Sequence, residues 1–356
     1  MKCVDLGSEY CPCPLALTGD CLICSRLQER GGSDGSSERM FPSSEDCDCE
    51  WSGSCPYTVL AQNGGKAAEG RREFSVKLVE RKDYGEDGSV LVFNVGQGFA
   101  QKASQPGSFV FLRRVCREGQ DRGVAETGSF VYGDTPISVM RTDEAEGTIH
   151  LAIRREGPKS KMLLDRSLAI DDAVVRGPYY SGLLGADVLK PANCRGKRIL
   201  FLTKGIGAAP ALLVMNRLMT MLGTGMETAW REGASSNLPI RWLADDTKID
   251  REMIEDYVRM IGGDIRPEYT VLTGLSGLLE RRMWPKDLGR EMYDIVVVTG
   301  SPYFVETMSC EVRKQFPEAK LVVSNDATMC CGEGICGACT EVAEDGRVIR
   351  RCKCGE

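Results

Sequence analysis

Cysteine is the residue type with the clearest chemical meaning in this chain. It occurs 17 times in 356 residues beside a single histidine, which favours metal or redox chemistry at sulfur over catalysis by imidazole. Three cysteines near the C-terminus, Cys331, Cys336 and Cys339, follow a C-x4-C-x2-C spacing. A fourth, Cys352, lies farther downstream. The glycine-rich loop between them can wrap closely around an inorganic cluster, which predicts a 2Fe-2S centre. A structural zinc site is the alternative, but zinc sites favour paired C-x2-C knuckles and do not need the glycines.

Eight further cysteines lie within residues 1–55, where apolar periodicity is weak and a Gly/Ser/Asp-rich stretch interrupts the chain. A segment of this composition needs a metal to fold. Seven of the eight are candidate ligands of a second metal, for which four would suffice: Cys11, Cys13, Cys21, Cys24, Cys47, Cys49 and Cys55. Thiolate ligands alone do not separate a further iron-sulfur cluster from zinc. We expect a cysteine-rich metal-binding extension over residues 1–66.

The elements that would position the C-terminal cysteines lie between the two cysteine-rich ends. Residues 72–192 hold short alternating runs between Gly, Asp and Pro turns, which predicts an antiparallel β-barrel with His150 in a strand. Residues 195–325 alternate strand and helix patterns, which predicts a parallel sheet covered on both faces, typical of a nucleotide-binding α/β domain. Residues 326–356 form the expected 2Fe-2S segment. The predicted architecture is multidomain, α+β and α/β.

Two features at strand ends of the α/β domain predict nucleotide binding. The strand RILFLT runs into Gly205 and Gly207, with Pro210 in the first turn of an apolar helix. The glycines let the backbone approach a pyrophosphate, and the missing N–H of the proline costs nothing in that turn. The strand PIRWLA ends in Asp245 and Asp246, whose carboxylates can accept from ribose hydroxyls and would repel a 2′-phosphate, which favours NADH. The alternative is an N-cap pair for the following helix.

The charge balance limits the choice of partners. There are 45 Lys and Arg against 51 Asp and Glu, a net charge of −6, which argues against binding along a nucleic acid. No stretch approaches the roughly 18 uninterrupted apolar residues of a membrane span, and the first residues lack the apolar core of a secretion signal. We therefore expect a cytoplasmic protein with no membrane span.

Over residues 72–356 the chain resembles the electron-transfer subunit of type B dihydroorotate dehydrogenase, within the ferredoxin-NADP reductase superfamily. In that family an FAD-binding barrel, a nucleotide-binding α/β domain and a C-terminal 2Fe-2S segment follow in this order. The family's end motifs are similar to Met329-Cys330-Cys331-Gly332 and Cys352-Lys353-Cys354-Gly355, which assigns Cys331 and Cys352 as ligands over Cys330 and Cys354. Small subunits of NADPH-linked ferredoxin transhydrogenases and of sulfide dehydrogenases look the same, so the family does not fix the reaction.

The resemblance implies an FAD site built from three segments in family order. They are Thr135-Pro136-Ile137-Ser138, Gly157-Pro158-Lys159-Ser160 and Gly177-Pro178-Tyr179-Tyr180-Ser181-Gly182. Ser138 is similar to the serine that contacts the flavin ring near N5, which implies a catalytic role. Thr135 stands where the family has a pyrophosphate-pairing arginine, so the charge would come from Arg154, Arg155 or Lys159. The second segment would meet the pyrophosphate at a helix N-terminus.

The nicotinamide site implied by the resemblance uses two turns. The first, Gly205-x-Gly207-x-x-Pro210, resembles the superfamily's dinucleotide turn. The second, a family Cys-Gly-Pro ahead of a helix, is similar to Thr299-Gly300-Ser301-Pro302. Thr299 therefore stands beside the nicotinamide where the family has a cysteine, which implies a catalytic position for it.

Taken together, these features imply an electron-transfer subunit. NADH would deliver a hydride to FAD, and single electrons would pass to the 2Fe-2S centre and on to a separate catalytic subunit that holds the substrate site, with electrons also able to flow in reverse. One alternative is the small subunit of an electron-bifurcating NAD(P)H-ferredoxin transhydrogenase. Another is a non-catalytic metal-binding scaffold that has lost flavin and nicotinamide binding, which Thr135 and Thr299 favour.

Overall fold

The chain divides into two compact units, each of which is described by itself. The computed structural model describes residues 3–5, 10, 62, 64, 71–114, 134–165, 172–194, 196–226, 240–261, 268–275, 277, 292–342, 346 and 348–354. The central unit is Glu73–Asp326, and the terminal unit combines Met1–Arg72 with Ala327–Glu356. The seven N-terminal candidate metal ligands, Cys11 to Cys55, lie outside the described residues. No described helix is both long enough and apolar enough to cross a membrane.

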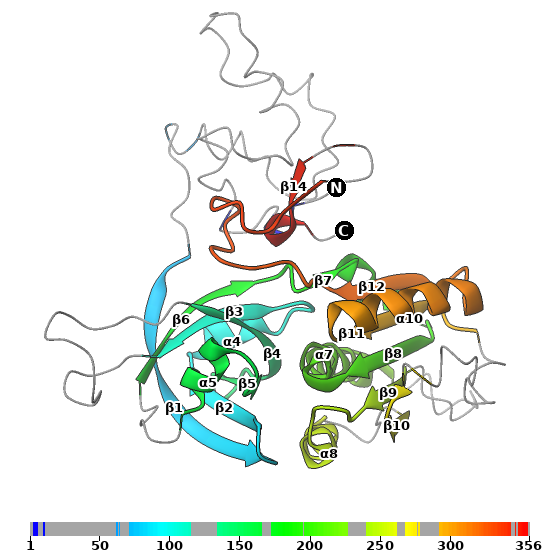
Figure 1. Ribbon diagram of the computed structural model, residues 1–356, viewed down its shortest axis with the longest axis horizontal. Coiled ribbons are helices and arrows are strands. Elements are labelled where there is room, and N and C mark those ends of the chain that lie inside the picture. The colour runs from blue at the N-terminus through cyan, green and yellow to red at the C-terminus, as the bar shows by residue number, and fades with distance from the viewer. Residues whose placement is uncertain are drawn as a thin grey trace, which may run out of the picture. The chain divides into compact units, whose positions relative to one another are not determined.

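A closed six-stranded antiparallel barrel forms the first half of the central unit (Figure 1). Its strands run in the order β1-β2-β5-β4-β3-β6. Their bounds are β1 Glu73–Tyr84, β2 Gly88–Asn94, β3 Phe109–Arg114, β4 Thr135–Asp143, β5 Thr148–Arg154 and β6 Asp172–Tyr179. Alternate residues of these strands, including Leu91, Val110 and Leu151, are fully buried in its core. The predicted barrel is therefore confirmed, with His150 in β5 as expected.

Two barrel elements were not predicted. Strand β6 closes the barrel by pairing with both β1 and β3, although its sequence ends in Gly177-Pro178, a pair typical of a turn. Helix α4, Gln97–Ala103, spans only seven residues and buries only Ala100 and Ala103, so it leaves almost no helical periodicity in the sequence. Helix α5, Pro158–Leu163, is short and follows β5, and it begins at the segment where the resemblance implies a helix N-terminus.

A six-stranded α/β sheet forms the second half of the central unit, in the order β10-β9-β8-β11-β12-β7. The strands are β7 Leu183–Leu184, β8 Ile199–Lys204, β9 Ile240–Asp245, β10 Glu268–Leu272, β11 Ile295–Thr299 and β12 Lys320–Ser324. Five are parallel, as predicted, because runs such as IVVVT are buried along their whole length and need cover on both faces. The two-residue β7 adds an antiparallel edge that was not predicted.

Helices cover the two faces of this sheet. They are α7 Ala208–Met226, α8 Arg251–Met260 and α10 Pro302–Gln315, with short turns η2 Ala186–Leu189, α6 Pro191–Cys194 and η3 Gly205–Gly207. Apolar side chains of α7 and α8 share one core with Phe201 and Trp242, whereas those of α10 share another with Leu200 and Val298. Alternate residues of each strand thus point to opposite cores. The helix predicted near residues 275–282 lies largely outside the described residues.

The sheet order reverses at β8. The chain moves outward from β8 to β9 and β10, then returns to β11 and β12 on the other side of β8. Such a reversal opens a crevice at the carboxyl ends of the two central strands, and nucleotides bind there in open α/β sheets. The residues that follow β8 and β11 are therefore the candidate nucleotide-binding residues.

Helices α7 and α8 join the barrel to the sheet. Leu213 of α7 is buried within the barrel core. In Figure 1 this helix lies between β4 of the barrel and β8 of the sheet, so it serves both halves. On α8, Asp256 accepts a hydrogen bond from Tyr84 Oη at 2.9 Å, and Tyr257 Oη lies 2.8 Å from His150 Nδ1. Tyr84 and His150 belong to the barrel, so α8 is held to it by polar contacts as well as by packing.

We expect the single histidine to titrate far below its ordinary range. Burial, with help from the charge of Arg141, lowers the pKa of His150 from 6.5 to about 4. The unfolded chain takes up this proton near pH 6.5, so the contribution to stability is complete above that pH and is lost as the pH falls towards 4, by up to about 3 kcal/mol. The imidazole resonances of His150, free of overlap in a chain with one histidine, will report the midpoint by NMR.

The matched variant for this titration is His150→Gln, which keeps a hydrogen-bonding side chain opposite Tyr257 and removes the titrating group. Urea unfolding at pH 7 and pH 4.5 should show a smaller pH dependence for the variant than for the native chain. A His150 midpoint near 6.5 would show that the imidazole is not sealed between β5 and α8.

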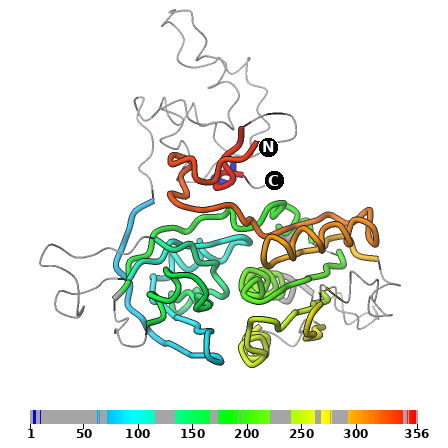
Figure 2. The backbone as a smooth tube through the Cα atoms, viewed as in Figure 1, coloured from blue at the N-terminus to red at the C-terminus, as the bar shows by residue number. Residues whose placement is uncertain are grey.

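The terminal unit brings the two ends of the chain together. Cys3 forms an antiparallel bridge with Cys354, and the Val4 amide donates to the Lys353 carbonyl at 3.0 Å. The remaining elements are the hairpin β13 Thr340–Val342 and β14 Val348–Arg350, followed by the turn η5 Arg351–Lys353. In Figure 2 the first described residues, in blue, lie against the red C-terminal segment. The sequence predicts separate modules for these two ends.

Candidate functional site

The two predicted glycine turns meet at the reversal point of the sheet. Strand β8 ends in the turn η3, where Gly205 has a φ of +56°, and α7 begins at once. A Cβ on Gly207 would lie 2.5 Å from the Thr299 carbonyl oxygen, so only glycine lets the two turns approach this closely. The Thr299 hydroxyl, which is fully buried, donates to the Gly207 carbonyl at 2.7 Å. Pro210 is buried in the first turn of α7, as expected.

The second turn, Thr299–Pro302, also requires a glycine because a neighbouring side chain lies close to its backbone. A Cβ on Gly300 would lie 2.7 Å from the Phe304 ring, and Pro302 is the first residue of α10. No side chain caps the amides of this helix, whose N-cap residue is Ser301. The carboxyl ends of β8 and β11 thus carry two turns of close-lying backbone followed by helix N-termini, an arrangement that suits a negatively charged phosphate.

The aspartates after β9 are engaged within the fold. Asp245 is fully buried, and its carboxylate accepts from the Thr247 and Leu275 amides, both at 2.8 Å. Asp246 accepts from the Thr273 hydroxyl at 2.7 Å and pairs with Arg251 at 2.9 Å. Each carboxylate also faces a cation, because Lys204 Nζ lies 3.8 Å from Asp245 and Arg251 pairs with Asp246, so the preference for NADH stays a prediction.

Neither aspartate caps the helix that follows, so the alternative interpretation of Asp245 and Asp246 is wrong. The N-cap of α8 is Asp250, whose Oδ1 accepts from the Glu252 amide at 2.8 Å. The residues between β9 and α8 form a loop in which Lys248 has a φ of +70°, a value rare outside glycine.

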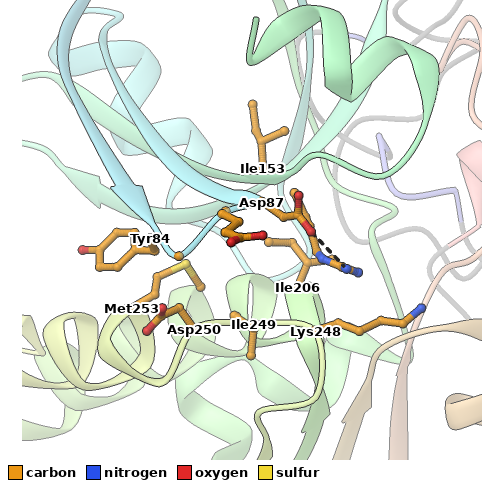
Figure 3. A pocket seen from close by; sticks show the side chains of 12 residues that line it. Tyr84, Asp87, Ile153, Ile206, Lys248, Ile249, Asp250 and Met253 are labelled. Carbon is orange, nitrogen blue, oxygen red and sulfur yellow. Dashed lines mark ion pairs between the residues drawn. The ribbon is translucent and has the colours of Figure 1, made fainter. Parts of the chain in front are cut away.

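A cavity of about 240 Å³ lies beside the β8 turn (Figure 3). Its walls come from the β1–β2 turn and the end of β5 on the barrel, and from the β8 turn, the β9–α8 loop and α8 on the other side. Its labelled lining residues are Tyr84, Asp87, Ile153, Ile206, Lys248, Ile249, Asp250 and Met253. Ile206, the middle residue of the glycine turn, faces this cavity, so the cavity joins the barrel to the reversal point of the sheet.

The predicted flavin motif lies on β4, where Ser138 pairs with Phe109 of β3. Of the three cations proposed to replace the family arginine, Lys159 is the one beside Thr135, because its Nζ donates to the Asp134 carbonyl at 2.9 Å. Arg155 donates instead to the Leu164 carbonyl at 2.6 Å, and Arg154 pairs with carboxylates at the edge of the cavity.

Two arginines that sequence reasoning missed gather at the same end of β4. Arg176 pairs with Asp134 at 2.8 Å and stacks 4.4 Å above the Phe111 ring, and Arg113 reaches Asp134 at 3.5 Å. The available signal was Arg176 itself, a charged residue within the apolar run that leads into Gly177. The start of β4 thus has three cations close together.

The second flavin segment begins helix α5, and the third continues from the end of strand β6. The Ser160 oxygen accepts from the Glu156 and Gly157 amides at 3.0 and 3.1 Å, so it caps the start of α5 from within the first turn of that helix. Gly177 and Pro178 lie inside β6, next to β3, where a Cβ on Gly177 would approach Val110 at 3.3 Å. The three predicted segments therefore lie on β4, at the start of α5, and at the end of β6 with the residues that follow it.

In the terminal unit, the four C-terminal cysteines form two pairs of neighbouring thiols. Cys336 contacts Cys331, and Cys339 hydrogen-bonds to Cys352, which lowers the pKa of the Cys339 thiol below its usual value. Gly332, Gly334 and Gly337 have φ of 72°, 73° and 75°, so the loop needs their freedom. Within the described residues, no group of three or more His, Cys, Asp or Glu side chains is placed to hold a metal ion.

Backbone amides in this loop point at the sulfurs. Cys331 Sγ accepts from the amides of Glu333 and Cys336 at 3.3 and 3.4 Å, and Cys336 Sγ accepts from Ala338 at 3.5 Å. Cys330, the neighbour of Cys331, is exposed, and Cys354 donates to the Arg350 carbonyl at 3.2 Å. Cys330 also hydrogen-bonds to Cys336, so the choice of Cys331 over Cys330 as a ligand stays a prediction.

Comparison with solved structures supports the fold. The chain is similar to the NADH-dependent reduced ferredoxin-NADP oxidoreductase studied for flavin-based electron bifurcation, at 18% identity and a TM-score of 0.52, over 79% of this chain and 86% of that one. It also matches the ferredoxin reductase of carbazole 1,9a-dioxygenase, at 16% identity and a TM-score of 0.47, over 71% and 67%. A third match is a ferredoxin NADP+ reductase from Neisseria gonorrhoeae with bound FAD and NADP, at 12% identity and a TM-score of 0.43, over 71% and 98%.

The first of these similarities confirms the predicted fold class of the central unit, a β-barrel followed by an α/β sheet. At such low identity it shows the fold alone. No protein-family model matches the chain, and no curated protein matches it in sequence.

Proposed function

We propose that this chain is an electron-transfer subunit that passes electrons between NAD(H), FAD and a 2Fe-2S cluster, to or from a separate catalytic subunit. The observation that carries the proposal is the meeting of the Gly205–Gly207 and Thr299–Pro302 turns at the reversal point of a sheet that is joined to a barrel. A dinucleotide at these turns would have its pyrophosphate on backbone amides and a barrel next to it.

The residues around the two glycine turns would bind the nicotinamide nucleotide and orient it. Gly207 and Gly300 provide close backbone approach, and the uncapped amides of α10 provide hydrogen-bond donors. The Thr299 hydroxyl is tied to the Gly207 carbonyl, so it fixes the distance between the two turns. The role we propose for Thr299 is therefore to hold the nicotinamide pocket in shape beside the hydride path.

The start of β4 fits the FAD pyrophosphate. Lys159, Arg113 and Arg176 gather there with the carboxylates of Asp134 and Glu73, and three cations against two anions leave the net positive charge that Thr135 lacks. Ser138, farther along the same strand, would donate to the flavin ring. Bound FAD would supply the conversion between the two-electron chemistry of nicotinamide and the one-electron chemistry of a cluster.

The C-terminal loop fits a 2Fe-2S cluster by its donor set. A cluster of this type takes four thiolates in all, and the loop offers two neighbouring pairs, Cys331 with Cys336 and Cys339 with Cys352. Three amides already point at these sulfurs, and such hydrogen bonds tune iron-sulfur centres.

The test is anaerobic purification of the full chain with iron, zinc and flavin quantified, followed by addition of NADH or NADPH. We expect NADH to bleach the flavin absorbance and to produce the EPR signal of a reduced 2Fe-2S centre, with NADPH slower because of the Asp245 and Asp246 charges. Iron in excess of two per chain would assign a cluster to the N-terminal cysteines, and zinc would assign a structural site.

A second candidate is the small subunit of an electron-bifurcating transhydrogenase. It is favoured by the fold similarity to the NADH-dependent reduced ferredoxin-NADP oxidoreductase. It predicts that the chain purifies with a larger flavin- and cluster-containing partner. If flavin is absent and NADH leaves a dithionite-reducible cluster oxidised, the electron-transfer proposal fails and the scaffold alternative replaces it.

A further inference from the structure

Four charged side chains form a buried network in the terminal unit. Lys353 Nζ lies 2.6 Å from Asp5 and 3.1 Å from Glu333, and Arg71 pairs with Asp5 and, at 3.3 Å, with Glu333. The side chains of Asp5, Arg71 and Lys353 are at most 2% exposed. The Arg71 guanidinium also stacks 3.8 Å above the Tyr10 ring. Two positive and two negative groups are thus held away from water.

This network touches the proposed cluster loop at two places. Glu333 lies two residues after Cys331, and its own amide donates to the Cys331 sulfur at 3.3 Å. Lys353 directly follows Cys352, which is itself buried. The network therefore links the neighbours of two proposed ligands that come from different parts of the C-terminal segment.

The other half of the network comes from the N-terminal segment. Asp5 follows the Cys3 bridge to Cys354, and the Val4 amide binds the Lys353 carbonyl, so the backbone of residues 3–5 is fixed against the end of the chain. Burial raises the pKa of Asp5, but the charges of Lys353 and Arg71 outweigh it and hold the carboxylate in its charged form. The N-terminal segment thus brings one negative and one positive charge to the loop.

Buried charges act on their surroundings with little screening. Removal of one member of a buried ion pair leaves the other uncompensated, and the effective dielectric is lower than in water. The reduction potential of an iron-sulfur cluster depends on net charge, hydrogen bonds and exposure around it. A change of one charge in this network should therefore appear in the potential.

From this geometry we infer that Asp5 and Arg71 are positioning residues that hold the cluster loop through Glu333 and Lys353 and set the reduction potential of the 2Fe-2S centre. The inference rests on the proposed function for the presence of that cluster. It makes the N-terminal segment a working part of the cluster site and not only a carrier of a second metal.

The test is a pair of variants with opposite charge changes, made in the full chain. Asp5→Asn leaves excess positive charge and should raise the reduction potential, whereas Arg71→Gln leaves excess negative charge and should lower it. Mediated redox titration with dithionite, followed by EPR, reads the potential without NADH or flavin. A purely structural disturbance would move both variants in one direction, so shifts of opposite sign are the expected result.

The matched control is Glu341→Gln, which makes the same charge change at an exposed carboxylate of the same unit, paired with Arg351. Solvent screens that site, so its potential should stay at the native value. The double variant Asp5→Asn with Arg71→Gln restores the charge balance and should return the potential towards the native value.

The outcomes separate this inference from the proposed function. If the native chain contains no iron, the proposed function itself is wrong. A native cluster whose potential is unchanged in Arg71→Gln, or moves upward, would overturn this inference alone. If Asp5→Asn does not fold, Arg71→Gln decides by the sign of its shift.

Discussion

Cys352→Ser is expected to abolish the EPR signal of the 2Fe-2S centre while NADH still bleaches the flavin. Cys352 is buried and hydrogen-bonded to Cys339, and in the proposed function it supplies one thiolate of the second pair. Serine cannot replace a thiolate as a ligand of comparable softness, and the loss of one of four ligands releases the cluster. Iron content should fall by about two per chain, and electron passage to one-electron acceptors should be lost with it.

The control for this variant is Cys354→Ser, two residues away. Cys354 is equally buried, but its thiol donates to the Arg350 carbonyl, a bond that a serine hydroxyl can keep. This variant should retain both iron and the EPR signal. A cluster that survives Cys352→Ser and disappears with Cys354→Ser would show that the ligand assignment between these two neighbours is reversed.

The regular elements of the fold could be predicted because their patterns are local. Strands β8, β11 and β12 are continuous apolar runs, and α10 repeats its buried side chains at helical spacing, so each is visible within a short window. Strand β6 and helix α4 were missed for the opposite reason. The first is buried by partners far along the chain despite its Gly-Pro pair, and the second is too short to show a period.

In the candidate site, too, local sequence signals were predicted and contacts between distant elements were missed. Glycine turns after strands are local signals, and Gly207 and Thr299 do meet. The buried role of Asp245, the capping role of Asp250 and the gathering of Arg113 and Arg176 depend on contacts between separate elements. The pairing of residues 3–5 with residues 353–354 is an extreme case, because nearly the whole chain separates the two.

Gly207→Ala is expected to destroy nicotinamide binding and to destabilise the central unit. The new Cβ would lie 2.5 Å from the Thr299 carbonyl oxygen and 2.7 Å from the Gly300 amide nitrogen, distances that backbone atoms on both sides cannot relieve without moving the two turns apart. Overpacking of a tight site costs about 3 kcal/mol, and here it also breaks the hydrogen bond from Thr299 to Gly207. Urea unfolding and NADH titration of the flavin absorbance measure the two effects.

Gly98→Ala is the matched control, because a Cβ on Gly98 meets nothing within 4 Å. Gly98 lies inside α4, where alanine should raise stability by about 0.5 to 1 kcal/mol through its helix propensity, with NADH binding unchanged. The two glycines therefore undergo the same substitution with opposite expected signs. If Gly207→Ala kept the native stability and affinity for NADH, the close approach of the β8 and β11 turns would not be what forms the nucleotide site, and the proposal for the central unit would lose the observation that carries it.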